Sequence, residues 1–349
     1  MKRIILLVVL LISFVFSGCS LNKSESTPIK KPDIKLQKQG YSYTKNEDKF
    51  FITEIISSPS LKNNKLGDPI QQEARVFLPP SYYSETEKRY PVVYYLHGFG
   101  SSFLEIDWYR NNYKSFVTNK KNKEFILVGV NGRNKLDGSF YVNSPVTGNW
   151  EDYIINDVVS FIDNKYKTIA MPSSRGISGF SMGGFGALSL GFHHPEIFSC
   201  IFAISPGIFE RVDVKKVLTT WNSKIITAYG AAFAPNLDKP YPYVELPIFN
   251  NTSRDKIIIT KWINGTGNFE LKVSKYINNI RQLTGVQVAY GTKDAFYWIP
   301  NGCKNLSKSL TDKKIKNTLI EFDGNHGDKN NVIVDKYMFP YFSKLLKVQ

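Results

Sequence analysis

One serine of the sequence has neighbours that are typical of a nucleophile. Residues 179–184 read Gly-Phe-Ser-Met-Gly-Gly, with a short apolar segment before them and a run of small residues after them. A serine on a tight turn between a strand and a helix has its hydroxyl exposed above the sheet, and small neighbours are needed because this turn is crowded. The pattern predicts that Ser181 is a nucleophile and that a helix begins at Met182, with free amides that favour developing negative charge.

A serine nucleophile needs a base, and the chain has four histidines. His326 follows the last expected strand, which is where the base lies in proteins with such a turn, so it is predicted to be the general base. His97 ends an earlier strand and is better placed to shape the loop that holds an oxyanion. His193 and His194 lie at the far end of the helix after the serine and are interpreted as capping it. Because adjacent side chains face different directions, these two are not expected to form a metal pair.

The third member of such a site is a carboxylate between the serine and the base in chain order, on a loop that follows a strand. Asp294 meets both conditions, because it comes shortly after the expected strand 286–290. Glu210, after the preceding strand, and Asp323, beside the base, are the alternatives. Asp294 is predicted to hold the base in the tautomer that accepts the proton of the serine.

Strand and helix patterns alternate along the chain, which is typical of an α/β fold with a mostly parallel central sheet flanked by helices. The predicted strands, of which the first two are antiparallel at the sheet edge, are residues 50–56, 73–78, 92–96, 125–130, 176–179, 200–204, 286–290 and 318–322. The predicted helices are residues 150–166, 182–193 and 336–346.

Residues 206–284 interrupt this alternation and are rich in aromatic residues, so they are predicted to form a cap-like insertion with helices of its own. The insertion leaves the carboxyl end of a strand, the edge that borders the ligand crevice in open α/β sheets. Its aromatic residues, Trp221 and Trp262 among them, are therefore expected to line the substrate site. For each of them, packing in the core is the alternative explanation.

The first residues of the chain are expected to be a targeting signal rather than part of the folded domain. Residues 1–18 combine two basic residues, an apolar run and small residues, which is typical of a signal peptide, and Ser-Gly-Cys resembles a lipoprotein cleavage site. Cys19 is predicted to carry a lipid, and residues 19–45 are predicted to be a flexible tether because they are poor in aromatic residues. Residues 46–349 are left as one catalytic domain, held at the extracellular face of a bacterial cell membrane.

The composition of the chain limits which classes of function are expected. With 42% hydrophobic and 14% aromatic residues among 349, the chain is expected to have a large core. The net charge of +15 comes from scattered lysines rather than a basic stripe, so a solvated surface is favoured over nucleic-acid binding. No cofactor is expected, and no metal, because no zinc-type cluster of His, Cys and carboxylate is recognised.

Several segments together resemble one known group, the Putative esterase family. They are residues 94–100, 143–157, 175–191 and 194–198. That family includes esterase D, S-formylglutathione hydrolase, tributyrin, feruloyl and enterochelin-type esterases and mycolyltransferases. The resemblance implies an α/β-hydrolase fold over about residues 50–346. The sequence departs from many relatives in two ways: the loop after His97 has one glycine fewer, and the insertion is long.

The resemblance implies that Ser181, Asp294 and His326 form the family's triad and that the amides of Phe99 and Met182 form its oxyanion hole. The expected activity is serine-dependent hydrolysis of carboxylic esters through an acyl-enzyme, with a small-molecule or carbohydrate ester, such as a feruloyl or acetyl ester, as the partner. Acyl transfer with the same triad is one alternative. A non-catalytic binding lipoprotein is another.

Overall fold

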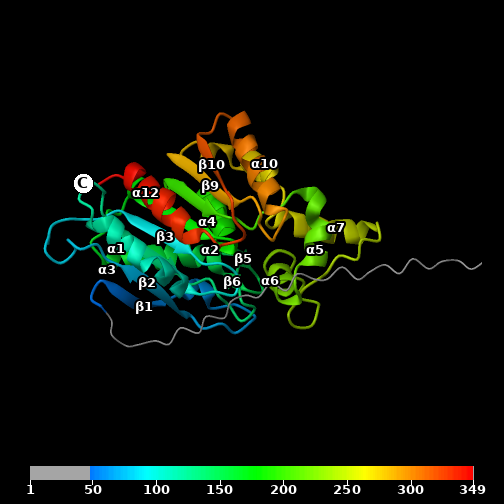
Figure 1. Ribbon diagram of the computed structural model, residues 1–349. Coiled ribbons are helices and arrows are strands. Elements are labelled where there is room, and N and C mark those ends of the chain that lie inside the picture. Colours follow the sequence, from blue (N-terminus) through cyan, green and yellow to red (C-terminus); the bar gives the residue numbers. More distant parts are fainter. Residues whose placement is uncertain (1–47, 349) are drawn as a thin grey trace, which may run out of the picture. The chain divides into compact units, whose positions relative to one another are not determined.

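The computed structural model describes residues 48–348, so the predicted signal peptide, Cys19 and the whole of the predicted tether lie outside the described part of the chain. Within this part, one eight-stranded sheet has the order β1-β2-β4-β3-β7-β8-β9-β10. The strands are β1 (Phe51–Ser57), β2 (Gln71–Phe77), β3 (Val92–Leu96), β4 (Ile126–Val130), β7 (Arg175–Phe180), β8 (Cys200–Ile204), β9 (Gly285–Gly291) and β10 (Asn317–Phe322). Strands from the two ends of the described part form the two edges of the sheet (Figure 1).

The predicted strands and their pairing are confirmed, with bounds that agree within two residues. Strand β2 is antiparallel to both β1 and β4, whereas the other neighbouring strands are parallel. Strands β3, β4 and β8 are buried along their whole length, which explains their continuous apolar sequences. A short hairpin of β5 (Asn143–Ser144) and β6 (Gly148–Asn149) lies outside the large sheet.

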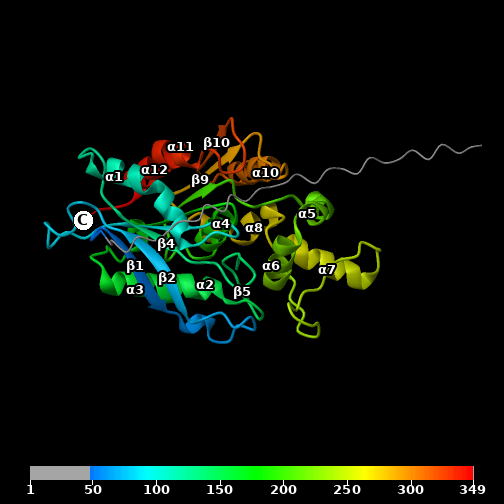
Figure 2. The same ribbon diagram turned by 60° about the horizontal axis from the view of Figure 1, so that its bottom comes forward.

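Helices cover both faces of the sheet (Figure 2). One face packs against α2 (Trp150–Asp152), α3 (Val159–Lys165), α4 (Met182–His193) and α10 (Ile299–Asp312). The other face packs against α1 (Arg110–Thr118), α11 (Asn330–Ile333) and α12 (Phe339–Leu345). The single helix predicted over 150–166 is divided, because a π-helical segment, Tyr153–Val158, separates α2 from α3.

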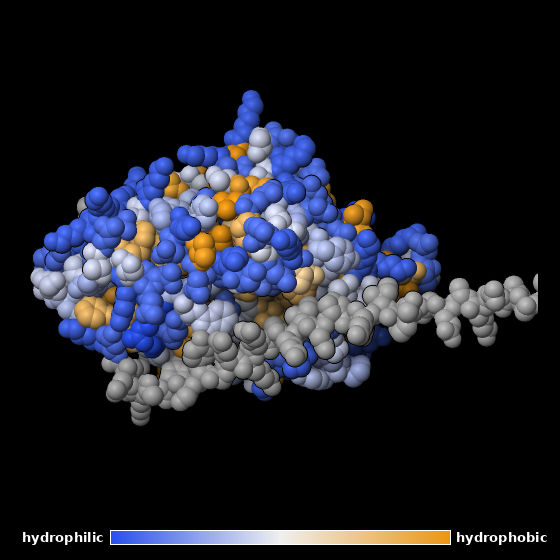
Figure 3. Space-filling view, in the orientation of Figure 1, coloured by the Kyte–Doolittle hydropathy of each residue, from blue (hydrophilic) through white to orange (hydrophobic). Residues whose placement is uncertain are grey.

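The face of the described part that Figure 3 shows is mainly polar. Hydrophilic residues cover most of the face in Figure 3, and small hydrophobic groups lie between them. This distribution agrees with the scattered lysines of the sequence. None of the helices between residues 48 and 348 combines the length and the apolarity that crossing a bilayer requires.

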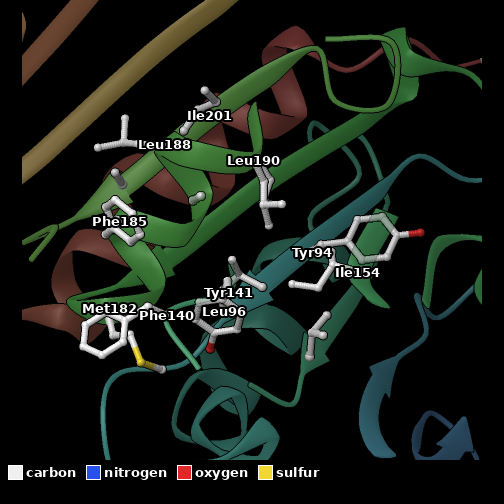
Figure 4. Close-up of a cluster of buried hydrophobic side chains, with 14 of the residues drawn as sticks. Tyr94, Leu96, Phe140, Tyr141, Ile154, Met182, Phe185, Leu188, Leu190 and Ile201 are labelled. Carbon is white, nitrogen blue, oxygen red and sulfur yellow. The ribbon is translucent and has the colours of Figure 1, made fainter. Parts of the chain in front are cut away.

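Helix α4 is the most deeply buried helix near the sheet, and its bounds are those predicted. Its first eleven residues, 182–192, are all buried. Figure 4 shows its side chains Phe185, Leu188 and Leu190 within the hydrophobic cluster on this face of the sheet. A Cβ atom at Gly183 would overlap the carbonyl oxygen of Leu96, so the backbones of α4 and β3 are in direct contact. This contact fixes the start of α4, and therefore Ser181, relative to the sheet.

The insertion has helices of its own, as predicted. They are α5 (Val214–Thr220), α6 (Ser223–Phe233), α7 (Ser253–Asn264), α8 (Phe269–Lys275) and α9 (Ile277–Ile280). Tyr229 and Trp262 are fully buried and stack on each other at 5.2 Å between ring centroids. The indole nitrogen of Trp262 donates a hydrogen bond to the carbonyl oxygen of Glu245 at 2.9 Å. These two aromatic residues therefore form the core of the insertion.

Candidate active site

Ser181 lies on the turn between β7 and α4 with φ 56° and ψ −112°. This backbone conformation is rare for a residue with a side chain and is held by three hydrogen bonds. The Ser181 amide donates to Ile204 at 2.9 Å, and its carbonyl oxygen accepts from the amides of Phe185 at 3.0 Å and Gly207 at 2.9 Å. Gly179 is required because a Cβ atom there would overlap the backbone of Gly183. The local sequence thus forces the sharp turn that the pattern predicts.

The structure brings Ser181, His326 and Asp294 together. The Ser181 Oγ atom lies 2.9 Å from His326 Nε2, and His326 Nδ1 lies 2.8 Å from Asp294 Oδ2. The Asp294 side chain is 0% exposed, and its second oxygen accepts the amide of Phe296 at 2.8 Å. The His326 ring packs against the rings of Phe180 and Phe296, whose centroids lie 4.7 and 4.9 Å from its own. A proton can pass from the hydroxyl to the ring along this series without any side chain moving.

The two alternative carboxylates lie elsewhere. Asp323 pairs with Lys293 at 2.6 Å, and its side chain is 77% exposed. Glu210 is partly buried, and this burial raises the pKa of its carboxyl. Among residues 48–348, neither carboxylate forms a hydrogen bond with His326.

Asn325 joins the loop of the acid to the loop of the base and was not identified from the sequence. Its side-chain oxygen accepts the amide of Ala295 at 2.7 Å and the amide of His326 at 2.7 Å. The backbones of the two loops are joined again by the bond from the Lys293 amide to the Gly324 carbonyl, at 3.0 Å. The separation of acid and base is therefore fixed by the polar contacts of an otherwise ordinary turn residue.

The side chains of Phe99 and Met182, the residues whose amides are expected to bind an oxyanion, both lie against Gly138. A Cβ atom at Gly138 would lie 2.6 Å from Met182 Sδ and 2.6 Å from Phe99 Cδ2. Met182 is the first residue of α4, so its amide has no acceptor within the helix. The contact between Gly183 and the end of β3 brings this amide to the loop that carries Phe99.

His97 shapes this loop, as the sequence indicates. The Gly132 amide donates to His97 Nε2 at 2.9 Å, so Nδ1 carries the ring proton and donates to the Gly98 carbonyl at 2.7 Å. Burial lowers the pKa of His97 to about 4, because a charged ring has lost its hydration there. A neutral His97 therefore holds the backbone just before Phe99.

Glu105 supports the same loop and was missed in the sequence. Its carboxyl accepts the Gly98 amide at 3.0 Å and the Tyr95 hydroxyl at 3.0 Å. Burial raises the pKa of Glu105 to about 7, and the hydrogen bond from the Gly98 amide opposes this rise only in part. A glutamate in the apolar segment 103–106 is the signal that could have identified it, since a buried carboxyl requires hydrogen-bond donors.

A series of contacting aromatic rings, some of them in the insertion, runs from the oxyanion loop at Phe99 to the base His326. From the oxyanion loop to the base, the rings follow in the order Phe99, Phe140, Tyr229, Trp221, Trp298, Phe296 and His326. The centroids of successive rings are 6.2, 5.3, 5.1, 6.1, 5.5 and 4.9 Å apart. Trp221 is only partly buried, whereas Trp262 packs behind Tyr229 within the insertion. Of the two tryptophans expected to wall the site, Trp221 alone belongs to this series.

His193 and His194 lie at the end of α4 remote from Ser181, as predicted, and both side chains contact Glu151. His193 Nδ1 lies 3.0 Å from Glu151 Oε1, and His194 Nε2 lies 2.8 Å from the same oxygen. Adjacent side chains do leave a helix in different directions. The two rings converge here because one presents its Nδ1 atom and the other its Nε2 atom.

Comparison with known proteins identifies the family. Residues 66–240 match the family described as Esterase, Putative esterase. An endo-1,4-beta-xylanase/feruloyl esterase of Xylanibacter ruminicola is 26% identical over 208 residues, which are 57% of this chain and 27% of that protein. Esterase Rv1288 of Mycobacterium tuberculosis is 32% identical over 114 residues, 31% of this chain and 24% of that protein. The chain thus spans about a quarter of the length of these relatives.

Solved structures show the same fold. A ferulic acid esterase superposes with a TM-score of 0.61 at 19% identity, covering 84% of this chain and 98% of that one. An S-formylglutathione hydrolase of Staphylococcus aureus gives 0.56 at 16% identity, covering 85% and 98%. The arrangement of sheet, helices and strand-to-helix turn is that of an α/β-hydrolase, and the chain belongs to the Putative esterase family.

Proposed function

We propose that this protein is a serine carboxylic-ester hydrolase that works through an acyl-enzyme. The observation that carries the proposal is the hydrogen-bonded series from Ser181 Oγ through His326 to Asp294. His326 takes the hydroxyl proton at Nε2 as Ser181 Oγ attacks the ester carbonyl carbon. Asp294 keeps the ring proton on Nδ1 and stabilises the imidazolium that forms.

The carbonyl oxygen becomes negatively charged in this step, and the amides of Phe99 and Met182 are proposed to bind it. The backbone contact of Gly183 with the carbonyl groups of Leu96 and His97 supports this role, because it brings the start of α4 to the loop that carries Phe99. Loss of one such donor typically costs about 2.7 to 4 kcal/mol of transition-state stabilisation. His326 then protonates the leaving alcohol, and a water molecule activated by the same ring releases the acyl group from Ser181.

We propose an acylated carbohydrate, such as a feruloyl or acetyl ester, as the substrate class. Relatives named as feruloyl esterases support this choice. The partly exposed members of the aromatic series, Phe99, Trp221 and Phe296, also support it, because aromatic rings favour an apolar or aromatic acyl group. Acyl transfer would use the same triad and a different acceptor, so turnover with and without added alcohol distinguishes the two reactions.

The decisive experiment is Ser181→Ala. The variant is expected to fold normally, to lose hydrolysis of p-nitrophenyl, feruloyl and acetyl-sugar esters, and to lose labelling by a fluorophosphonate probe. Undiminished labelling would show that another residue is the nucleophile. A wild-type chain that neither reacts with the probe nor turns over any ester would instead support a non-catalytic binding role.

We also propose that residues 1–18 are removed as a signal peptide, that Cys19 carries a lipid and that residues 19–45 tether the catalytic domain to the extracellular face of the membrane. The order of basic, apolar and small residues before Cys19 supports this proposal. Cys19→Ser is expected to move the protein out of the membrane fraction or leave it unprocessed. An unmodified Cys19 in the membrane-bound protein, found by mass spectrometry, would contradict the proposal.

A further inference from the structure

Three side chains with metal-binding atoms meet at the end of α4 that is remote from Ser181. His193 Nδ1 and His194 Nε2 lie 3.0 and 2.8 Å from Glu151 Oε1, and the three atoms lie within 4.8 Å of one another. Two imidazole nitrogens and one carboxylate oxygen form a ligand set that zinc prefers. We propose that Glu151, His193 and His194 bind a divalent transition-metal ion, with Zn²⁺ as the ion that fits best.

Contacts around the cluster hold these ligands in orientations suited to a metal. His194 Nδ1 lies 2.9 Å from Glu196 Oε1, so a neutral His194 ring donates its proton to Glu196 and leaves Nε2 free to bind. A second carboxylate that orients a metal-binding histidine in this way is a recurring feature of metal sites. The His193 ring packs on Tyr276 at 4.3 Å, which fixes the direction of its Nδ1 atom.

Movements of the three side chains by about 1.5 Å or less would admit the ion. Ligand atoms about 2.0 to 2.1 Å from a tetrahedral Zn²⁺ are separated from one another by about 3.3 Å. The two nitrogens must therefore move away from Glu151 Oε1 by a few tenths of an ångström. Because the three atoms lie within 4.8 Å of one another, the nitrogens must also approach each other by at most about 1.5 Å, which rotation of the side chains can provide. The side chains of Glu151, His193 and His194 are 17%, 24% and 18% exposed, so the cluster is sheltered yet open to water. Three protein ligands leave a fourth position that a water molecule fills.

The position of the site separates it from ester chemistry. Helix α4 has 12 residues, so its two ends lie about 18 Å apart at 1.5 Å per residue. The ion would connect the start of α2, at Glu151, to the end of the helix that begins after Ser181. Its expected effect is to stabilise the folded chain, because a ligand that binds only the folded state shifts the unfolding equilibrium.

The test uses the full chain, stripped of metal with a chelator, and Zn²⁺ alone as the probe. Isothermal titration is expected to give one Zn²⁺ per chain, and thermal unfolding is expected to move to a higher Tm with Zn²⁺ but not with Mg²⁺ or Ca²⁺. Co²⁺ in the same site should give the intense visible absorption of a four-coordinate ion. Glu151→Gln and His194→Ala should each abolish these signals, while Glu196→Gln should weaken Zn²⁺ binding by about 10- to 100-fold.

His326→Ala is the matched control, because it removes the other histidine that is paired with a carboxylate. It should bind Zn²⁺ with unchanged stoichiometry, and near-ultraviolet circular dichroism should show that every variant is folded. Absence of Zn²⁺ binding to the wild type at about 0.1 mM would overturn the proposal and leave the cluster as hydrogen-bonded ion pairs only. Binding that survives both Glu151→Gln and His194→Ala would overturn it too, by placing the ion elsewhere.

Discussion

The side-chain oxygen of Asn325 lies 2.7 Å from the backbone amide nitrogen of Ala295, the residue after Asp294. The same oxygen accepts the amide of His326. One amide side chain thus sets the spacing between the residue that orients the ring and the ring itself. Because a displacement of about 1 Å in a catalytic group can reduce the rate about a hundredfold, this contact is expected to matter for turnover.

Asn325→Ala is expected to lower kcat by about 10- to 100-fold with little change in KM, since the loops of the acid and the base lose their shared acceptor. Asn325→Asp retains an accepting oxygen and should recover most of the activity. Steady-state kinetics of both variants on one p-nitrophenyl ester tests this. A rise in KM without a fall in kcat would assign Asn325 to substrate binding instead.

Asp294→Asn should leave stability nearly unchanged and lower turnover by about 10⁴-fold, because the amide favours the wrong tautomer of the His326 ring. The exposed Asp323 and the partly buried Glu210 serve as controls, and Asp323→Asn and Glu210→Gln should each lower turnover far less. The measurement is kcat at neutral pH together with the urea midpoint of each variant. Equal losses in all three variants would argue against Asp294 as the specific acid.

Glu105 predicts a pH dependence of stability. Its pKa of about 7 in the folded chain exceeds the usual 4.5, so the folded state binds this proton more tightly than the unfolded state does. The contribution to the free energy of unfolding is therefore fully present below about pH 4.5 and falls as pH rises through 7, by about 3 kcal/mol at most. Urea denaturation at several pH values measures it.

Glu105→Gln should remove this component, so the variant gains stability relative to the wild type as pH rises from 5 to 8. The exposed Glu87 provides the control, and Glu87→Gln should keep the wild-type dependence. A Glu105→Gln curve parallel to that of the wild type would show that folding does not raise the pKa of this carboxyl.

Trp221 and Trp262 are predicted to differ, although the sequence alone treats them alike. Trp221→Ala should change the ratio of kcat/KM values among acyl chains, because its ring contacts Trp298 beside the base. Trp262→Ala should cost about 3 to 5 kcal/mol of stability and leave the ratios unchanged, because the ring is fully buried in the insertion. An ester panel and thermal unfolding of both variants separate the two effects.

Patterns of burial explain why much of the fold could be predicted. Strands 92–96 and 200–204 have apolar residues throughout because both faces of the sheet are covered, and helix 182–193 is bounded by a serine turn and a proline. Two helices of the insertion begin after capping residues, Asn222 before α6 and Thr252 before α7. Such residues are also frequent in turns, and the exact bounds of these helices were not predicted. A π-helical segment within 150–166 keeps the same apolar face, so periodicity does not reveal it.

Contacts distant in sequence account for what was missed at the site. The Gly-Phe-Ser-Met-Gly-Gly segment and chain order lead to Ser181, Asp294 and His326, which the fold brings together. Glu151 meets His193 only because α2 and α4 pack on the same face of the sheet. The role of Asn325 could not be predicted, because its contact with Ala295 depends on how the fold places the loop of Asp294 beside it.

The contact of Gly183 with Leu96 has a consequence for how such a site can diversify. The spacing of the Met182 and Phe99 amides depends on main chain touching main chain, with no side chain in between. Replacing either side chain can therefore reshape what the enzyme accepts while the two amides keep their separation. Any residue larger than glycine at position 183 would push the amides apart. Substrate preference can therefore change through the side chains of Met182 and Phe99, whereas the spacing of the amides that bind the oxyanion cannot.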